Sequence, residues 1–116
     1  MLRRTRLPEN VRTVDWIPIN AALPYCAGVV HHGGAGSVLG ALACGVPQLV
    51  VPGPGDRRHN AELVARRGAG LAVPEPEIST AVLDQLVTDP ALATAAAEVR
   101  AEMATMPDPA EVVPRL

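Results

Sequence analysis

Histidine and glycine crowd one short stretch of this sequence, VVHHGGAGSVLG at residues 29–40. His31 and His32 are adjacent, three glycines follow within the next four residues, and Ser37 then opens a segment of helical pattern. Glycines before a helix leave backbone N–H groups that an anion can approach, and the helix dipole favours negative charge there. The stretch therefore predicts a phosphate or diphosphate site with His32 and Ser37 as further donors. The alternative is that the glycines only form a tight strand-to-helix turn.

Three other chemistries fit this stretch less well. A dinucleotide fingerprint needs a third glycine where GAGSVL has Leu39. A nucleophile elbow, G-x-S-x-G, is not matched around Ser37. A metal site made by His31 and His32 is disfavoured, because neighbours on a strand point to opposite faces. For the same reason we expect His31 to face away from the site, as a buried residue with a hydrogen-bonded ring.

The elements that must position these residues follow from alternating apolar runs and helical segments. We expect strands at 11–15, 28–32, 47–51 and 70–73. We expect helices at 37–45, 57–68, 79–89 and 90–106, and a short helical turn at 20–26. This order predicts an α/β fold, a doubly wound, Rossmann-like parallel sheet with flanking helices. The candidate residues then follow strand ends, where ligands bind in such sheets.

Local signals predict where the helices begin and end. Ser37 is the expected N-cap of its helix and Gly45 the residue that stops it. Ser79 is the expected N-cap of the helix at 79–89, and Pro90 suits the first position of the helix at 90–106.

Composition limits the possible partners. All ten basic residues are arginine, which excludes a P-loop lysine and Schiff-base chemistry. Phe is absent and Trp and Tyr occur once each, so nucleic-acid modules that stack bases on aromatics are not expected. Residues 1–74 carry eight arginines and four acids (+4), and residues 75–116 carry two and eight (−6), which sum to −2. This asymmetry favours a small anionic ligand over a polyanion, or is simply a solvated surface.

The expected location is cytoplasmic. No apolar run approaches the roughly 20 residues of a membrane-spanning helix, and the N-terminal arginines are not followed by a signal-peptide apolar stretch. The two cysteines lie in apolar segments without CxxC spacing, which suits a reducing compartment.

Four blocks in one order, VDWIP, VVHHGGAGS, GVPQLVVP and GDRRHNAELVARRGAG, resemble the donor-binding domain of GT-B glycosyltransferases. The closer likeness is to bacterial natural-product enzymes of the macrolide and enediyne type, and it covers residues 7–116. The resemblance implies that residues 1–116 are part of the C-terminal domain of a GT-B fold. The acceptor domain, which usually holds the general base, would be absent from this chain.

In the whole enzyme, the resemblance implies transfer of a hexose from a dTDP- or UDP-sugar to a hydroxyl of a small natural-product acceptor. Transfer would invert the anomeric carbon without metal or cofactor, and this chain alone would be inactive. The alternative is a non-catalytic nucleotide-binding or protein-interaction module. Because the missing parts would leave a sheet edge uncovered, we also expect the chain to form homo-oligomers.

The resemblance implies roles for residues near the nucleotide. Trp16 matches the aromatic residue that stacks on the base, or is a core residue at a strand end. His32 matches the histidine that contacts the diphosphate. Gly34, Gly36 and Ser37 match the loop and helix start that hold the phosphates.

Further matches concern the sugar and the framework. Asp56 matches the acid that hydrogen-bonds sugar hydroxyls, or is only the N-cap of the helix that follows. Arg57 stands where the family pattern often has Gln, and we place it among the donor-binding residues. Gly40 replaces a glutamate that can meet the ribose in many relatives. Asn60 and Ala61 match a structural pair.

Overall fold

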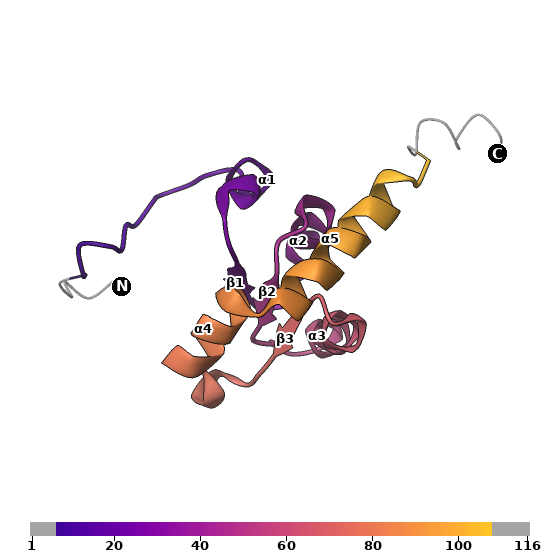
Figure 1. Cartoon of the computed structure of the whole chain (residues 1–116). Helices are drawn as coiled ribbons and strands as arrows, with labels where there is room; N and C mark the ends of the chain where they lie inside the picture. The colour runs from indigo at the N-terminus through magenta and orange to yellow at the C-terminus, as the bar shows by residue number, and fades with distance from the viewer. Residues whose placement is uncertain (1–6, 108–116) are drawn as a thin grey trace.

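A computed structural model describes residues 7–107 of the chain (Figure 1). Its sheet contains β1 (Val29–His31), β2 (Gln48–Val50) and β3 (Gly70–Ala72). The strands are parallel, and their order in the sheet is their order in the chain. Val30 lies opposite Leu49, and Leu49 lies opposite Leu71. The predicted parallel sheet with flanking helices is therefore confirmed, and its strands are shorter than the apolar runs that predicted them.

The helices are α1 (Ile19–Ala22), α2 (Ala35–Cys44), α3 (Asp56–Arg67), α4 (Thr80–Thr88) and α5 (Pro90–Ala104), with 3-10 turns η1 (Leu23–Tyr25) and η2 (Glu75–Glu77). The crossovers between adjacent strands are α2 and α3, and right-handed crossovers place both on one face of the sheet. These two helices contact each other, α5 packs on α2, and α4 contacts β2 (Figure 1). In the described part of the chain, no helix is both long and apolar enough to cross a membrane.

One cluster of the core lies between the central strand and the two crossover helices. All three residues of β2 are buried. Val50 packs in a cluster with Val38 of α2 and with Ala61 and Val64 of α3. The burial of Ala61 agrees with the structural role that the sequence predicted for it. This cluster holds both crossover helices against the end of β2.

Most helix ends follow the predicted signals. Gly45 ends α2 in the left-handed conformation with φ 68°. The Ser79 side chain caps α4 by accepting a hydrogen bond from the Val82 N–H at 3.2 Å. Pro90 is the first residue of α5, and Asp89 caps that helix. These ends were predictable because capping depends on residues close in sequence.

Two predicted N-caps are wrong. The N-cap of α2 is Gly34, not Ser37, and the helix begins at Ala35. With φ −62° and ψ 144°, Gly34 already has the extended backbone of an N-cap, so the helix starts before the serine is reached. The N-cap of α3 is Gly55, and Asp56 is the first helical residue, so the capping alternative for Asp56 is also wrong.

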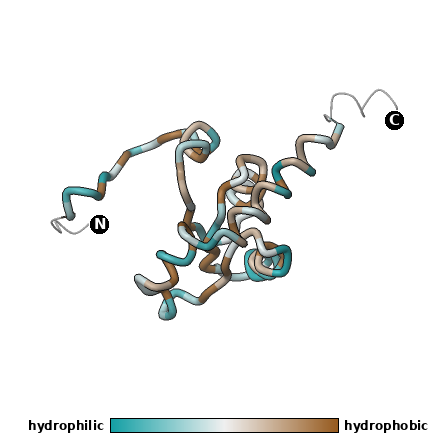
Figure 2. The backbone as a smooth tube through the Cα atoms, viewed as in Figure 1, coloured by the Kyte–Doolittle hydropathy of each residue, from teal (hydrophilic) through white to brown (hydrophobic). Residues whose placement is uncertain are grey.

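The strand predicted at 11–15 is not formed. This segment lies apart from the sheet, leads into α1 and pairs with no strand in residues 7–107 (Figure 1). Its apolar side chains are exposed, with Val14 at 63% and the following Trp16 at 82%. Figure 2 shows hydrophobic residues along it. The segment has the composition of a strand, but a strand also requires hydrogen-bonding partners on a neighbour.

Candidate functional site

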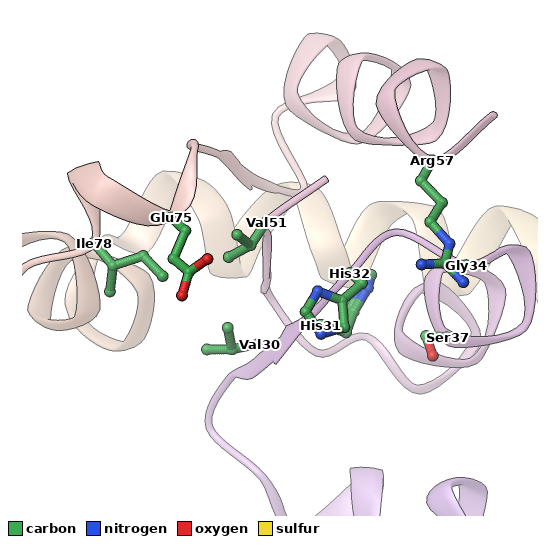
Figure 3. Close-up of a pocket in the computed structure, with 9 residues that line it drawn as sticks. All are labelled: Val30, His31, His32, Gly34, Ser37, Val51, Arg57, Glu75 and Ile78. Carbon is green, nitrogen blue, oxygen red and sulfur yellow. The ribbon is translucent and has the colours of Figure 1, made fainter. Parts of the chain in front are cut away.

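A pocket of about 500 Å³ opens at the carboxyl ends of β1 and β2 (Figure 3). Its lining residues are Val30, His31, His32, Gly34, Ser37, Val51, Arg57, Glu75 and Ile78. Four of the predicted donor-binding residues meet here: His32, Gly34, Ser37 and Arg57. They come from the end of β1, the start of α2 and the start of α3, so the crossover topology brings them together.

The two helices that start at this edge of the sheet have no side-chain cap. Gly34 precedes α2 and Gly55 precedes α3, and neither N-cap residue offers a side-chain acceptor to the first amides. By contrast, α4 and α5 are capped by Ser79 and Asp89. The first N–H groups of a helix have no intrahelical partner, and the dipole makes this end positive. The start of α2 therefore offers backbone donors to an anion in the pocket.

The three glycines that directly follow the two histidines have different roles. Gly33 has φ 94°, and a Cβ there would come within 2.8 Å of the Arg57 carbonyl oxygen, so the turn itself requires glycine. A Cβ at Gly34 or Gly36 would meet no heavy atom within 4 Å. Packing does not demand glycine at these two positions. The tight-turn explanation thus accounts for Gly33, whereas the bare backbone at Gly34 leaves the pocket wall open.

Arg57 brings a positive charge to the pocket from the first turn of α3. Its side chain packs against Gly53, and both Arg57 and Gly34 line the pocket (Figure 3). Within residues 7–107 the ion pairs are those formed by Arg67, so no described acid pairs with Arg57. Its charge is available to a ligand, and it adds to the positive potential of the helix ends.

The His31 ring is held through both of its nitrogens. Its Nδ1 accepts a hydrogen bond from the Gly33 N–H at 3.0 Å, and its Nε2 lies 2.6 Å from Gln48 Oε1. Burial lowers the pKa of His31 from its ordinary value of 6.5; the Gln48 bond raises this pKa, and the His32 charge lowers it further. The lowered pKa of His31 favours the neutral form of the ring. The predicted hydrogen-bonded ring is confirmed, whereas the residue is only partly buried and not buried as predicted.

The predicted orientation of His31 is wrong, because both histidines line the pocket. The prediction assumed that His31 and His32 both lie on the strand and so alternate between its faces. In the structure β1 ends at His31, and His32 belongs to the following turn. Strand alternation therefore does not apply to the pair.

Three predicted site residues do not line the pocket. Trp16 lies in the exposed segment before α1, and Gly36 is the second residue of α2. Asp56 is exposed at the start of α3, where its charge suits the helix dipole. Base stacking by Trp16 and sugar binding by Asp56 stay predictions.

The pocket also contains residues that sequence reasoning missed. Glu75 lies in η2, Ile78 follows that turn, and Val30 and Val51 complete an apolar wall. Figure 3 shows the Glu75 carboxylate at the end of the pocket away from Arg57. Their place in the sequence could have identified Glu75 and Ile78, because both follow the end of the strand predicted at 70–73, where ligands bind in such sheets.

The arrangement has the chemistry of an anion site. Backbone N–H groups of α2, the Ser37 hydroxyl, the His32 ring and the Arg57 guanidinium are all hydrogen-bond donors. In residues 7–107, no group of three or more His, Cys, Asp and Glu side chains is placed to hold a metal ion. The donor set fits a phosphate or diphosphate at the start of α2.

Comparison with known sequences gives a family match. The family model for "Erythromycin biosynthesis protein CIII-like, C-terminal domain" matches residues 3–116. The elloramycin glycosyltransferase ElmGT of Streptomyces olivaceus is 51% identical over 111 residues, which make up 96% of this chain and 28% of that protein.

Comparison with solved structures agrees. Spinosyn forosaminyltransferase SpnP is 36% identical with a TM-score of 0.91, over 99% of this chain and 32% of that one. The glycosyltransferase VinC in complex with dTDP is 39% identical with a TM-score of 0.87, over 95% of this chain and 29% of that one. This chain thus spans about a third or less of the length of these proteins.

Proposed function

Because this chain belongs to the family of erythromycin biosynthesis protein CIII-like C-terminal domains, we propose that it binds the nucleotide-sugar donor of a natural-product glycosyltransferase. The donor is a dTDP- or UDP-linked hexose. The observation that carries the proposal is the pocket that gathers His32, Ser37 and Arg57 around the uncapped start of α2. This is the charge and hydrogen-bond pattern that a diphosphate requires.

In the proposed reaction, a hydroxyl oxygen of the acceptor attacks the anomeric carbon of the sugar and gives its proton to a general base. The bond between that carbon and the diphosphate breaks, the configuration inverts, and the nucleoside diphosphate leaves with the bonding electrons. Negative charge therefore grows on the leaving group in the transition state. The α2 amides, His32 and Arg57 stabilise this charge as donors already in position, and the proposed mechanism uses no metal ion or cofactor.

We further propose that the acceptor and the general base are bound by another part of a longer polypeptide. The relatives contain about three times the length of this chain or more. The acceptor is then a small natural product with a free hydroxyl. Under this proposal, the 116-residue chain binds the donor nucleotide but does not transfer sugar.

Calorimetric titration of the chain with dTDP, UDP and thymidine tests the proposal. Thymidine is the matched control, because it keeps the base and sugar of dTDP and lacks the phosphates. We expect at least one diphosphate to bind at least about tenfold more tightly than thymidine, as hydrogen bonds to charged groups require. If neither dTDP nor UDP binds more tightly than thymidine, the pocket has no diphosphate role. The ratio of dTDP to UDP affinity identifies the preferred nucleotide.

A further inference from the structure

The His31 ring connects the glycine turn to a buried amide on the neighbouring strand. The Gly33 N–H donates to His31 Nδ1, and His31 Nε2 pairs with Gln48 Oε1. The Gln48 Nε2 then donates to the Val38 carbonyl oxygen at 3.4 Å. A continuous chain of hydrogen bonds thus runs from the turn, through two side chains, to the backbone of α2.

Backbone groups at the two ends of this chain determine the direction of every bond in it. The Val38 carbonyl can only accept, so the Gln48 NH₂ group faces it and Gln48 Oε1 faces His31. His31 Nε2 must then carry the proton. This leaves His31 Nδ1 as the acceptor that the Gly33 N–H requires. The neutral Nε2–H form is the one form of the ring that satisfies both neighbours.

The same turn is held from its other side. The Asn60 Nδ2 of α3 donates to the Gly33 carbonyl oxygen at 2.9 Å, which supports the structural role predicted for Asn60. Gly33 has a positive φ, and the next residue, Gly34, is the N-cap of α2. The orientation of the Gly33 peptide therefore sets the direction in which the first amides of α2 point.

Gln48 is an unusual residue for its position. It is completely buried, and the other two residues of β2 are Leu49 and Val50. A strand that only filled the core would hold an apolar residue here, because a buried amide is destabilising unless both of its ends are bonded. Gln48 has both ends bonded, and one of its two partners is His31.

We propose that His31 and Gln48 are positioning residues of the nucleotide site. Gln48 selects the Nε2–H form of His31, and His31 holds the Gly33 turn in the conformation that directs the α2 amides into the pocket. Burial, which lowers the pKa of His31, supports the same neutral form. This inference rests on the proposed diphosphate binding for its effect on the ligand, whereas its effect on the turn can be measured without one.

Two substitutions of His31 separate its hydrogen bond from its bulk. In His31→Asn the side-chain oxygen can accept the N–H two residues on, as in an Asx-turn. In His31→Leu a side chain of similar bulk offers no acceptor. Titrated with dTDP, His31→Leu should bind about tenfold more weakly than the wild type, and His31→Asn within about threefold of it. Equal losses in the two variants, or no loss in His31→Leu, would overturn the proposal.

Hydrogen exchange of the Gly33 amide gives a readout that needs no ligand. This amide should exchange at least about tenfold more slowly in the wild type and His31→Asn than in His31→Leu. Equal exchange in all three proteins overturns the inference whether or not dTDP binds. If the wild type protects the amide but binds no dTDP, the proposed function fails and the positioning of the turn stands.

The role of Gln48 has a spectroscopic signature. In the wild type at neutral pH, nitrogen-15 spectra should show His31 protonated on Nε2 and unprotonated on Nδ1. Gln48→Leu removes the acceptor for Nε2–H and should raise the population of the Nδ1–H form, together with faster exchange at Gly33. An unchanged tautomer in a folded Gln48→Leu variant would show that Gln48 does not select the ring form.

Discussion

Replacing Gly34 with alanine should affect the stability of the fold and the affinity for a ligand in opposite directions. Gly34 has φ −62° and ψ 144°, which alanine adopts without strain, and no heavy atom lies within 4 Å of the added Cβ. The folded state therefore loses no contact. Since alanine restricts the unfolded chain more than glycine does, the free energy of unfolding should stay unchanged or rise by about 0.4–1 kcal/mol.

The effect on ligand binding should be the opposite. Gly34 lines the pocket and caps α2, so the added methyl group stands where a diphosphate oxygen would approach the helix amides. Loss of one hydrogen bond between an amide and a charged oxygen costs about 1.5–3 kcal/mol. The affinity of Gly34→Ala for dTDP should therefore fall by about 10- to 150-fold.

The assay combines thermal unfolding with calorimetric titration of dTDP. Gly33→Ala is the matched control. Gly33 has a positive φ, and a Cβ added there would lie 2.8 Å from the Arg57 carbonyl oxygen, so the fold opposes a side chain at this position. We expect Gly33→Ala to lose at least about 1 kcal/mol of stability. If Gly34→Ala is stable and binds dTDP as tightly as the wild type, the open glycine does not serve ligand approach and the reasoning is refuted.

Four further measurements test other parts of the site and fold. His32→Ala should weaken dTDP binding by about 1.5–3 kcal/mol in calorimetry, and unchanged affinity in a folded variant would remove the diphosphate contact from His32. Arg57→Gln should weaken dTDP binding and flatten its dependence on salt, whereas an unchanged salt dependence would show that this charge does not reach the ligand. Because the folded-state pKa of His31 is lowered from 6.5, the unfolded chain binds more protons below that pH. In urea unfolding, the free energy of unfolding should therefore fall as the pH drops below 6.5, and it should fall less steeply in His31→Asn than in the wild type. The same dependence on pH in both proteins would contradict this. The outer edge of β1 has no partner among residues 7–107, and Val30 on this strand is 48% exposed. Light scattering should therefore detect self-association of the chain, and a monodisperse monomer at high concentration would count against this expectation.

Features encoded by neighbouring residues were predictable from the sequence. The stop of α2 at Gly45, the cap at Ser79 and the start of α5 at Pro90 each depend on residues within one helical turn. Ser37 was misassigned because serine is a strong N-cap residue but glycine can take the position as well. The backbone of Gly34 decides the outcome, and residue preference alone does not reveal it.

Features that depend on distant parts of the chain were not predictable in this way. The pattern at 11–15 indicates a strand but carries no information on whether a neighbour is available to pair with it. Glu75 enters the pocket because β3 lies beside β2 and delivers η2 to the same edge of the sheet. The partners of Gln48 likewise come from β1 and α2, so its role was not visible in the apolar run that contains it.

The two adjacent histidines have different roles because β1 ends between them, after His31. Both nitrogens of His31 are occupied by Gly33 and Gln48, so this ring has no remaining N–H to offer a ligand and can act only through the turn. His32 follows the strand end and is exposed at the pocket, where it can reach a ligand directly. Substituting His32 should therefore lower dTDP affinity while the exchange rate of the Gly33 amide stays the same. Substituting His31 with leucine should change both quantities, and identical behaviour of the two variants would show that this division is wrong.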